Sequence, residues 1–134
     1  MRGRIGTLFG SPWMTRLGLL LLCAAYLQGG IDKLADLPGA VAEQAHFGLA
    51  PAELFAVAVI GTELIGSALV LSGRLRWLGA LWLGAFTVIA SFLANRFWDL
   101  PPGMERFMAA NAFFEHLGLV GGFLLVAVRD LVAT

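Results

Sequence analysis

Charged residues are scarce in this sequence. Only 13% of the 134 residues are Asp, Glu, Lys or Arg, whereas 59% are hydrophobic. A soluble domain usually has about a quarter charged residues. The mean hydropathy is +0.83, and the formal net charge is zero, so no basic surface favours nucleic acid as a partner. These values argue against a soluble domain and predict a membrane protein in contact with the lipid bilayer.

Cysteine and histidine are nearly absent. Cys23 is the one cysteine, so a disulfide or a CxxC redox pair within the chain is excluded. No set of Cys and His residues has the spacing of a zinc site, and we expect no metal. His46 lies outside the apolar runs and His116 within one, which argues against a haem bound between them. Motifs for nicotinamide, flavin or iron–sulfur binding are also missing.

What the sequence has instead is four long apolar runs, at about residues 14–30, 54–71, 77–94 and 108–128. Each is about as long as a helix that crosses a bilayer. The turn at residues 72–74 allows only an antiparallel return, and the pair Pro101-Pro102 ends any helix before the last run. The sequence therefore predicts an all-α, up-down-up-down bundle of four transmembrane helices. We expect residues 1–134 to form a single membrane domain.

The basic residues are unevenly divided between the two ends of this bundle. Three, Lys33, Arg96 and Arg106, lie on one side. The other six lie on the side of both termini: Arg2, Arg4, Arg16, Arg74, Arg76 and Arg129. Because cytoplasmic loops are enriched in Lys and Arg, both termini are expected in the cytoplasm. This pattern predicts a multi-pass membrane protein with its more basic end in the cytoplasm.

Two carboxylates lie inside the apolar runs, where ionisable groups cost several kcal/mol and usually face other helices, a cavity or a ligand. Glu63 follows Pro51 by about 18 Å of helix, which places it near the middle of the bilayer. Glu115 shares a helical face with Asn111, Gly118 and Gly122. We expect Glu63 and Glu115 to point toward a common interior space.

The other polar residues near the ends of the runs predict where that space opens. They lie toward the side opposite the termini, so we expect a ligand pocket open to that side, with Glu63 at its floor. Its predicted residues are Gln28, Asp32, Lys33, Glu63, Asn95, Arg96, Asn111, Glu115 and His116. The alternative is that these groups only bind one another across helices, for example Lys33 or Arg96 with Glu115. No catalytic residue is assigned.

Several short motifs carry a resemblance to a known family. They are Gly-Gly-Ile-Asp-Lys-Leu at residues 29–34, Glu63 with Gly66, Phe-Leu-Ala-Asn-Arg-Phe-Trp at 92–98, Phe-Met-Ala-Ala-Asn at 107–111, and the run 118–125. In their order and spacing, over about residues 14–130, the chain resembles the DoxX family of small four-helix bacterial membrane proteins. Many such proteins have His in place of Asn95, and Lys in place of Ala110.

The resemblance implies a function in membrane-associated oxidoreductase systems, among them a subunit of a thiosulfate:quinone oxidoreductase. It implies an accessory or anchoring subunit with a redox-enzyme partner and a quinone as candidate ligand, more than an enzyme complete in itself. Two alternatives stay open. One is a small-molecule carrier or permease, which at this size would need a homodimer. The other is a non-catalytic membrane chaperone or receptor whose connection at residues 31–52 binds proteins.

Overall fold

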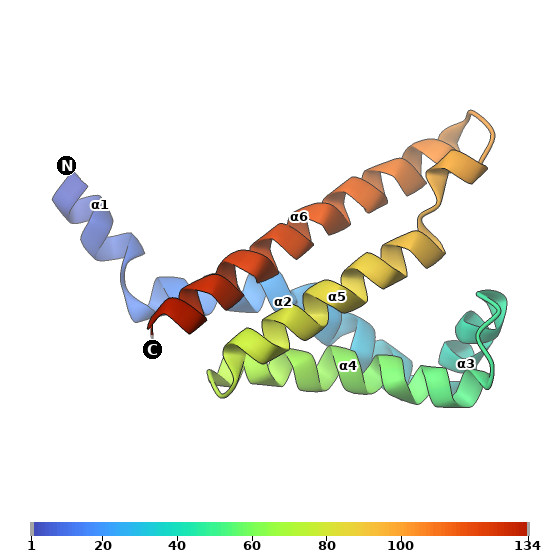
Figure 1. Cartoon of the computed structure of the whole chain (residues 1–134), viewed down its shortest axis with the longest axis horizontal. Coiled ribbons are helices and arrows are strands. Elements are labelled where there is room, and N and C mark those ends of the chain that lie inside the picture. Colours follow the sequence, from blue (N-terminus) through green and yellow to red (C-terminus); the bar gives the residue numbers. More distant parts are fainter. Residues whose placement is uncertain (1, 134) are drawn as a thin grey trace.

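The computed structural model describes residues 2–133, which form helices joined by short connections (Figure 1). The elements are α1 (Arg2–Phe9), α2 (Pro12–Ala35), α3 (Leu37–His46), α4 (Ala52–Ser72), α5 (Arg76–Ala94), the 3₁₀ turn η1 (Phe97–Asp99) and α6 (Met104–Ala133). The helices α2, α4 and α6, and α5 together with η1, are long and apolar enough to cross a membrane. The predicted all-α fold with four spanning helices is confirmed, and each helix extends past its apolar run at one or both ends.

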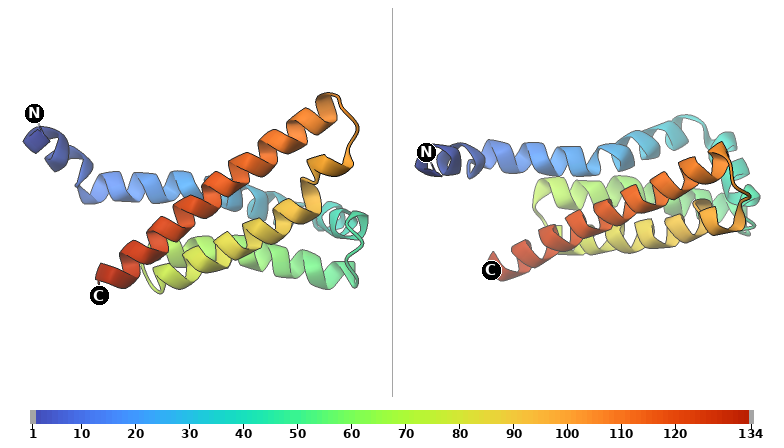
Figure 2. Two further views of the ribbon diagram at one scale, coloured as in Figure 1. Left: turned by 45° about the horizontal axis from the view of Figure 1, so that its top comes forward. Right: turned by 90° about the horizontal axis from the view of Figure 1, so that it is seen from above.

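The spanning helices alternate in direction between two ends of the bundle. The hairpin end contains the α4–α5 turn, the start of α2 and the end of α6, so both chain termini lie there (Figure 1). The pocket end contains α3, η1 and the connection from η1 to α6. At the pocket end α5 and α6 diverge from α2 and α4, with α3 packed against α4 (Figures 1 and 2).

Local sequence signals explain where these elements begin and end. Ser11 caps α2, accepting a hydrogen bond from the Met14 amide at 3.3 Å, and Pro12 occupies the first turn. The carboxylate of Asp36 accepts from the Gly39 amide at 3.1 Å and starts α3 directly after α2. Gly73 ends α4 with a φ of 82°, a conformation that glycine adopts without strain. These caps produce the two sharp turns that set α3 and α5 against α4.

At the hairpin end the helices approach closely and form the apolar core. Its buried members are Leu19, Cys23, Tyr26, Val70, Ala80, Leu83, Phe123 and Ala127, which come from all four spanning helices. Two glycines permit the contact between α4 and α5. A Cβ atom on Gly66 would lie 2.8 Å from Leu83, and one on Gly79 would lie 2.8 Å from the Gly66 carbonyl oxygen. Small residues that let backbones approach are the usual means of packing helices in a bilayer.

Large apolar side chains cover much of the outer surface of the spanning helices. Leu21, Val57, Ile89 and Leu125, one from each spanning helix, are each at least half exposed. Such surfaces are stable in lipid but not in water, because contiguous apolar patches on soluble proteins are small. The chain is therefore an integral membrane protein in contact with the lipid bilayer.

Candidate functional site: a cavity at the pocket end

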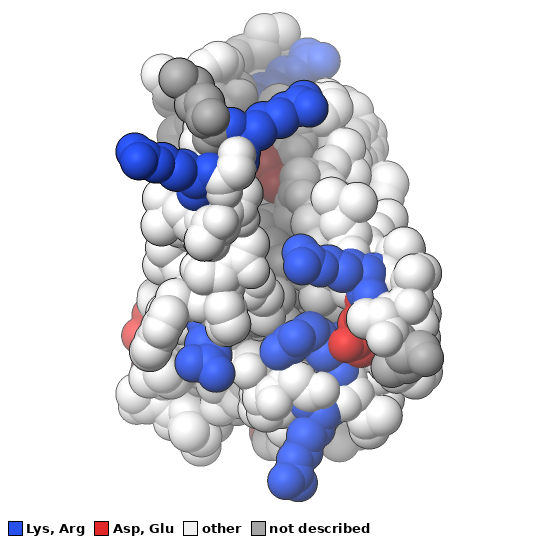
Figure 3. Space-filling model, turned by 90° about the vertical axis from the view of Figure 1, so that its left-hand side faces the viewer, with Lys and Arg blue, Asp and Glu red and all other residues white. Residues whose placement is uncertain are grey.

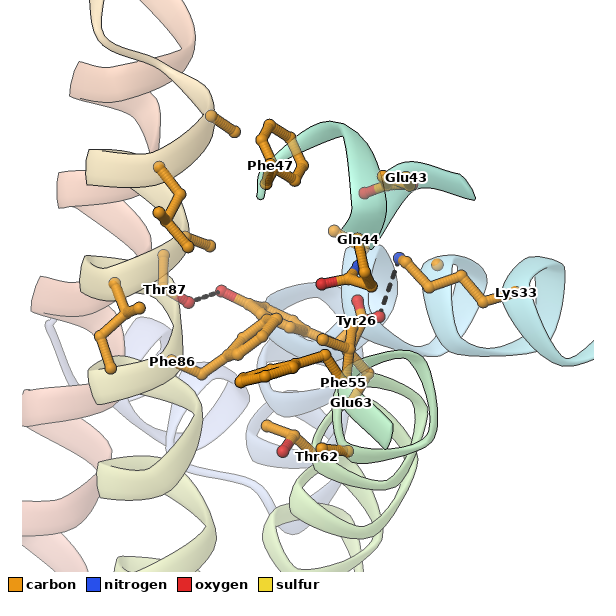
Figure 4. A pocket seen from close by; sticks show the side chains of 18 of the residues that line it. Tyr26, Lys33, Glu43, Gln44, Phe47, Phe55, Thr62, Glu63, Phe86 and Thr87 are labelled. Carbon is orange, nitrogen blue, oxygen red and sulfur yellow. Dashed lines mark hydrogen bonds and ion pairs between the residues drawn. The ribbon is translucent and has the colours of Figure 1, made fainter. Parts of the chain in front are cut away.

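A cavity of about 540 Å³ lies between the diverging helices at the pocket end (Figure 4). Residues of α2, α3, α4, α5 and α6 all line it, together with the connection after α3. Its polar lining residues are Tyr26, Gln28, Lys33, Glu43, Gln44, Thr62, Glu63, Thr87 and His116. Its size falls within the range of small-molecule sites in proteins, roughly 300–1,000 Å³.

An ion pair between α2 and α4 forms one wall of the cavity. Lys33 Nζ donates to Glu63 Oε1 at 2.9 Å, and the two side chains are 19% and 8% exposed. Gly29 makes room for the carboxylate, since a Cβ atom there would lie 2.8 Å from Glu63 Oε2. An ammonium has three donors and a carboxylate two oxygens, so both groups keep hydrogen-bonding capacity toward the cavity.

Gln44 of α3 lines the cavity next to this ion pair (Figure 4). The residue is only 4% exposed, yet its side-chain amide forms no hydrogen bond to any of residues 2–133. The amide atoms are not fully enclosed by protein, because they line the cavity and can be reached from it. The amide of Gln44 is therefore free to bind a molecule in the cavity.

A hydrogen bond between α2 and α5 closes the inner part of the cavity. The hydroxyl oxygens of Tyr26 and Thr87 are 2.5 Å apart, and the Thr87 hydroxyl also donates to the Leu83 carbonyl at 2.7 Å. Because a threonine hydroxyl has a single proton, Tyr26 is the donor in the bond to Thr87. The ring of Tyr26 packs edge-on against Phe123 of the apolar core. Tyr26 thus marks the boundary between the core and the cavity.

His116 of α6 completes the polar lining and is held by α5. Its Nδ1 lies 3.1 Å from Asn95 Nδ2 and 3.0 Å from the Ser91 hydroxyl. The Ser91 hydroxyl also donates to the Thr87 carbonyl at 2.7 Å, so these contacts tie the imidazole to α5. His116 therefore contributes a further polar group beside the cavity.

The remaining lining is apolar and partly open to the surface of the helices. Phe47, Phe55 and Phe86 provide aromatic walls (Figure 4). Ala58 of α4 and Leu93 of α5 also line the cavity and are exposed. The cavity can thus be reached from the side of the bundle, at the depth of the spanning helices.

The structure brings some of the sequence-predicted site residues together and not others. Gln28, Lys33, Glu63 and His116 line the cavity, and Asn95 contacts it through His116. Asp32 is exposed and accepts a hydrogen bond from Gln28. Arg96 is paired with Asp99, at 2.6 Å, on the surface. Asn111 and Glu115 are exposed on α6 and line no part of the cavity.

Glu115 does not share an interior space with Glu63, contrary to our expectation from the sequence. The face of α6 that packs on α5 contains Phe113, His116 and Phe123, and Glu115 lies beside that face. Sharing a helical face with Gly118 and Gly122 does not determine which neighbouring helix Glu115 faces. Of these two glycines, only Gly122 has a neighbour within 4 Å of the position that a Cβ atom would take, the side chain of Leu22 in α2.

Sequence reasoning missed Tyr26, Gln44 and Thr87 as site residues. Thr87, Ser91 and Asn95 are spaced by four and share a face of α5, which was a usable signal for Thr87. Tyr26 is the one tyrosine of the chain and lies in an apolar run, where its hydroxyl needs a partner. No comparable signal existed for Gln44, because it lies in the connection between two spans.

No group of three His, Cys, Asp or Glu side chains suited to a metal ion occurs within residues 2–133. The chain matches the family model DoxX over residues 15–96, which covers α2, α3, α4 and α5. No curated protein and no solved structure matches it. The matched residues make up more than half of the sequence, and they include Lys33, Gln44 and Glu63 of the cavity. The chain belongs to the DoxX family.

Proposed function

We propose that this chain is the membrane subunit of an oxidoreductase system and that its cavity binds a quinone. The observation that supports the proposal best is the amide of Gln44. The residue is 4% exposed, its amide has no hydrogen-bond partner among residues 2–133, and it lines a largely apolar cavity beside the Lys33–Glu63 pair. A molecule that accepts hydrogen bonds and has an apolar body would satisfy this amide.

A quinone has this chemistry. Its flat ring suits the walls formed by Phe47, Phe55 and Phe86. Its carbonyl oxygens accept hydrogen bonds, and Lys33 and Gln44 are donors that line the cavity. Its apolar tail would leave between α4 and α5, beside Leu93, directly into the bilayer.

The reducing partner in this proposal is another protein. The sequence contains no nicotinamide, flavin, haem or iron–sulfur motif, and the family includes accessory subunits of membrane oxidoreductases. The chain would then hold the quinone in the membrane while the partner supplies the electrons. Co-purification of the chain with a redox enzyme, and dependence of that enzyme's quinone reduction on the chain, would support this arrangement.

Binding can be tested on the purified chain in nanodiscs with a short-tailed benzoquinone as the probe, followed by calorimetry. Replacing Gln44 with Leu keeps the volume and removes the amide. Loss of one hydrogen bond should weaken binding by up to about tenfold. Lys33→Met should weaken it further, because a charged donor is lost. Arg96→Gln is the matched control, since Arg96 pairs with Asp99 outside the cavity, and should bind normally.

Absence of saturable binding to the wild-type chain would overturn the quinone proposal. Uptake of a small molecule into proteoliposomes, abolished by Glu63→Gln, would favour the carrier. Loss of a partner protein's assembly in the absence of this chain, without any quinone chemistry, would favour the chaperone or receptor. The last two results would each select one of the two alternative functions.

We also propose the bacterial inner membrane as the location, with both termini and the hairpin end in the cytoplasm. The resemblance to the DoxX family supports the location, and the charge distribution supports the orientation, with six basic residues at the hairpin end and three at the pocket end. The cavity would then lie in the outer half of the bilayer. A reporter fused to the C-terminus that is active only outside the cytoplasm would contradict this orientation.

A second copy of the chain is the proposed partner for the exposed face of α6 at Asn111 and Glu115. Glu115 follows Arg106 by nine residues and precedes Arg129 by fourteen, about 13 and 21 Å along the helix. A carboxyl group at that depth is costly in lipid. In a two-fold pair the amide of Asn111 and the carboxyl of Glu115 are complementary, because each copy supplies both.

A further inference from the structure

The helix α1 contributes nothing to the apolar core. None of its residues is buried, and it projects from the bundle at the hairpin end (Figures 1 and 2). Ile5, Leu8 and Phe9 are 49%, 59% and 60% exposed. Their spacing of three and four places them on one helical face. A helix of eight residues is marginal in water on its own, so this apolar face needs an environment that covers it.

The hairpin end is also strongly basic. It has six arginines, and Asp130 is its one acidic residue. The carboxylate of Asp130 accepts from the Trp77 backbone amide at 3.0 Å, and no arginine at this end forms an ion pair within residues 2–133. Arg2, Arg4, Arg74 and Arg129 are exposed, and Figure 3 shows basic side chains over this end of the molecule. Six cationic groups therefore share one acidic neighbour, and none of them is neutralised by an ion pair.

At the pocket end acidic residues outnumber basic ones. Its basic residues are Lys33, Arg96 and Arg106, against the acidic residues Asp32, Asp36, Glu43, Glu53, Asp99 and Glu105. Both ends lie at a membrane surface, because four helices span between them. An attraction to anionic headgroups is thus expected at the hairpin end alone.

We propose that α1 and the arginines of the hairpin end form a binding surface for anionic phospholipids. In this arrangement the chain turns at Ser11, between α1 and α2, and α1 lies along the membrane surface. Ile5, Leu8 and Phe9 enter the interface with Trp13, which is 75% exposed at the start of α2. Arg2 and Arg4 bind headgroup phosphates. A short amphipathic helix with basic residues is the usual form of an interfacial anchor. The surface is independent of the cavity.

The arginines next to the spans extend this surface around the end of the bundle. The guanidinium of Arg16 stacks over the Trp13 ring at 5.3 Å, which places a cation beside an aromatic residue typical of the interface. Arg76 Nε donates to the Val70 carbonyl at 2.7 Å, which fixes its guanidinium at the end of α4. Arginine binds phosphate through several donors in one plane, so a headgroup suits these sites better than a monovalent anion does.

The test uses the full chain in nanodiscs of phosphatidylcholine mixed with phosphatidylglycerol, and native mass spectrometry of the lipids retained after release. We expect the wild-type chain to retain phosphatidylglycerol in preference to phosphatidylcholine. The double variant Arg2→Gln and Arg4→Gln should lower that preference by roughly fivefold per arginine. These residues do not touch the core, so the variant should fold. The matched control, Arg96→Gln with Arg106→Gln at the pocket end, should keep the preference.

A second measurement follows α1 itself. Because Cys23 is buried, an environment-sensitive dye on Leu8→Cys reports on α1 alone. Its emission should shift to the blue when phosphatidylglycerol is present, and salt should reduce the shift. Equal retention of the two lipids, an equal loss in the control, or a dye that stays water-exposed in both lipids would overturn the proposal.

Discussion

At the hairpin end the four spanning helices meet through glycines and apolar side chains, whereas at the pocket end polar side chains line a space between them. The first region contains Gly66, Gly79 and Phe123, all buried. The second contains the Lys33–Glu63 pair and the unpartnered amide of Gln44. Packing energy is thus concentrated at one end, and hydrogen-bonding capacity at the other. A bundle fixed at one end can keep a cavity open at the other without losing its fold.

The largest effect should come from breaking the ion pair at the pocket end. Lys33→Met leaves the Glu63 carboxylate buried without its cation, which typically costs about 3–5 kcal/mol. We expect a loss of that size in the free energy of unfolding, measured by denaturant titration in mixed micelles. Arg96→Met is the matched control, because it removes an ion pair whose side chains are about half exposed. It should cost less than about 1 kcal/mol.

The double variant Lys33→Met with Glu63→Leu sharpens this test. Removing both charges should recover most of the stability, because an apolar pair of similar volume can replace a buried ion pair. Recovery of stability together with loss of quinone binding would separate the structural role of the pair from its binding role. An unstable double variant would instead mean that the pair is needed for the fold at the pocket end.

The next largest effect is expected at the hairpin end, where α4 and α5 lie too close together to accept larger side chains. Gly79→Ala would place a Cβ atom 2.8 Å from both the Gly66 carbonyl oxygen and Leu69 Cβ. Forcing an extra methyl into such a contact usually costs about 1–3 kcal/mol, and we expect a lower thermal midpoint. Gly118→Ala is the control, since nothing lies within 4 Å of its Cβ position. It should raise the midpoint, because alanine favours a helix by about 1 kcal/mol over glycine.

A smaller effect is expected where the two regions meet. Tyr26→Phe removes the hydrogen bond to Thr87 and keeps the ring contact with Phe123. The Thr87 hydroxyl still donates to the Leu83 carbonyl, so no donor is left without a partner. The cost should be about 1 kcal/mol in unfolding free energy. A loss as large as that of Lys33→Met would show that Tyr26 also holds α2 and α5 together through the cavity.

The fold was predictable because the length of each apolar run can be read directly from the sequence. Four apolar runs, the turn at Gly73 and the Pro101-Pro102 pair together determine four antiparallel spans. Glu63 was identified as a site residue for a similar reason, since a carboxylate in the middle of a span must find a partner. Its partner Lys33 was named among the pocket residues, but the pairing of the two required coordinates.

The rest of the site depends on the rotation of each helix about its axis and on the angles between the helices. The sequence of an apolar helix determines both of these poorly. In α6, Glu115 and His116 are adjacent in sequence, yet only His116 faces α5. A rotation of about 100° between neighbouring residues decides which of them reaches the cavity. Gln44 was missed because α3 returns over α4, and the tilt that opens the space between α4 and α5 has no signature in the sequence.

The smallest effect on stability should come from Glu115, whose exposed side chain forms no hydrogen bond or ion pair within residues 2–133. Exposed surface substitutions usually change stability by no more than about 0.5 kcal/mol, so Glu115→Leu should leave the unfolding free energy of one copy nearly unchanged.

If Glu115 pairs with Asn111 of a second copy, the same change should lower the dimer fraction, measured by single-molecule photobleaching in nanodiscs. Glu105→Leu, in the first turn of α6, is the matched control and should leave that fraction unchanged. A dimer fraction that is zero in the wild type, or equal in all three proteins, would mean that Glu115 faces lipid or another protein. Because cavity and dimer face lie on different sides of α6, quinone binding should be the same in all three proteins whichever result is found.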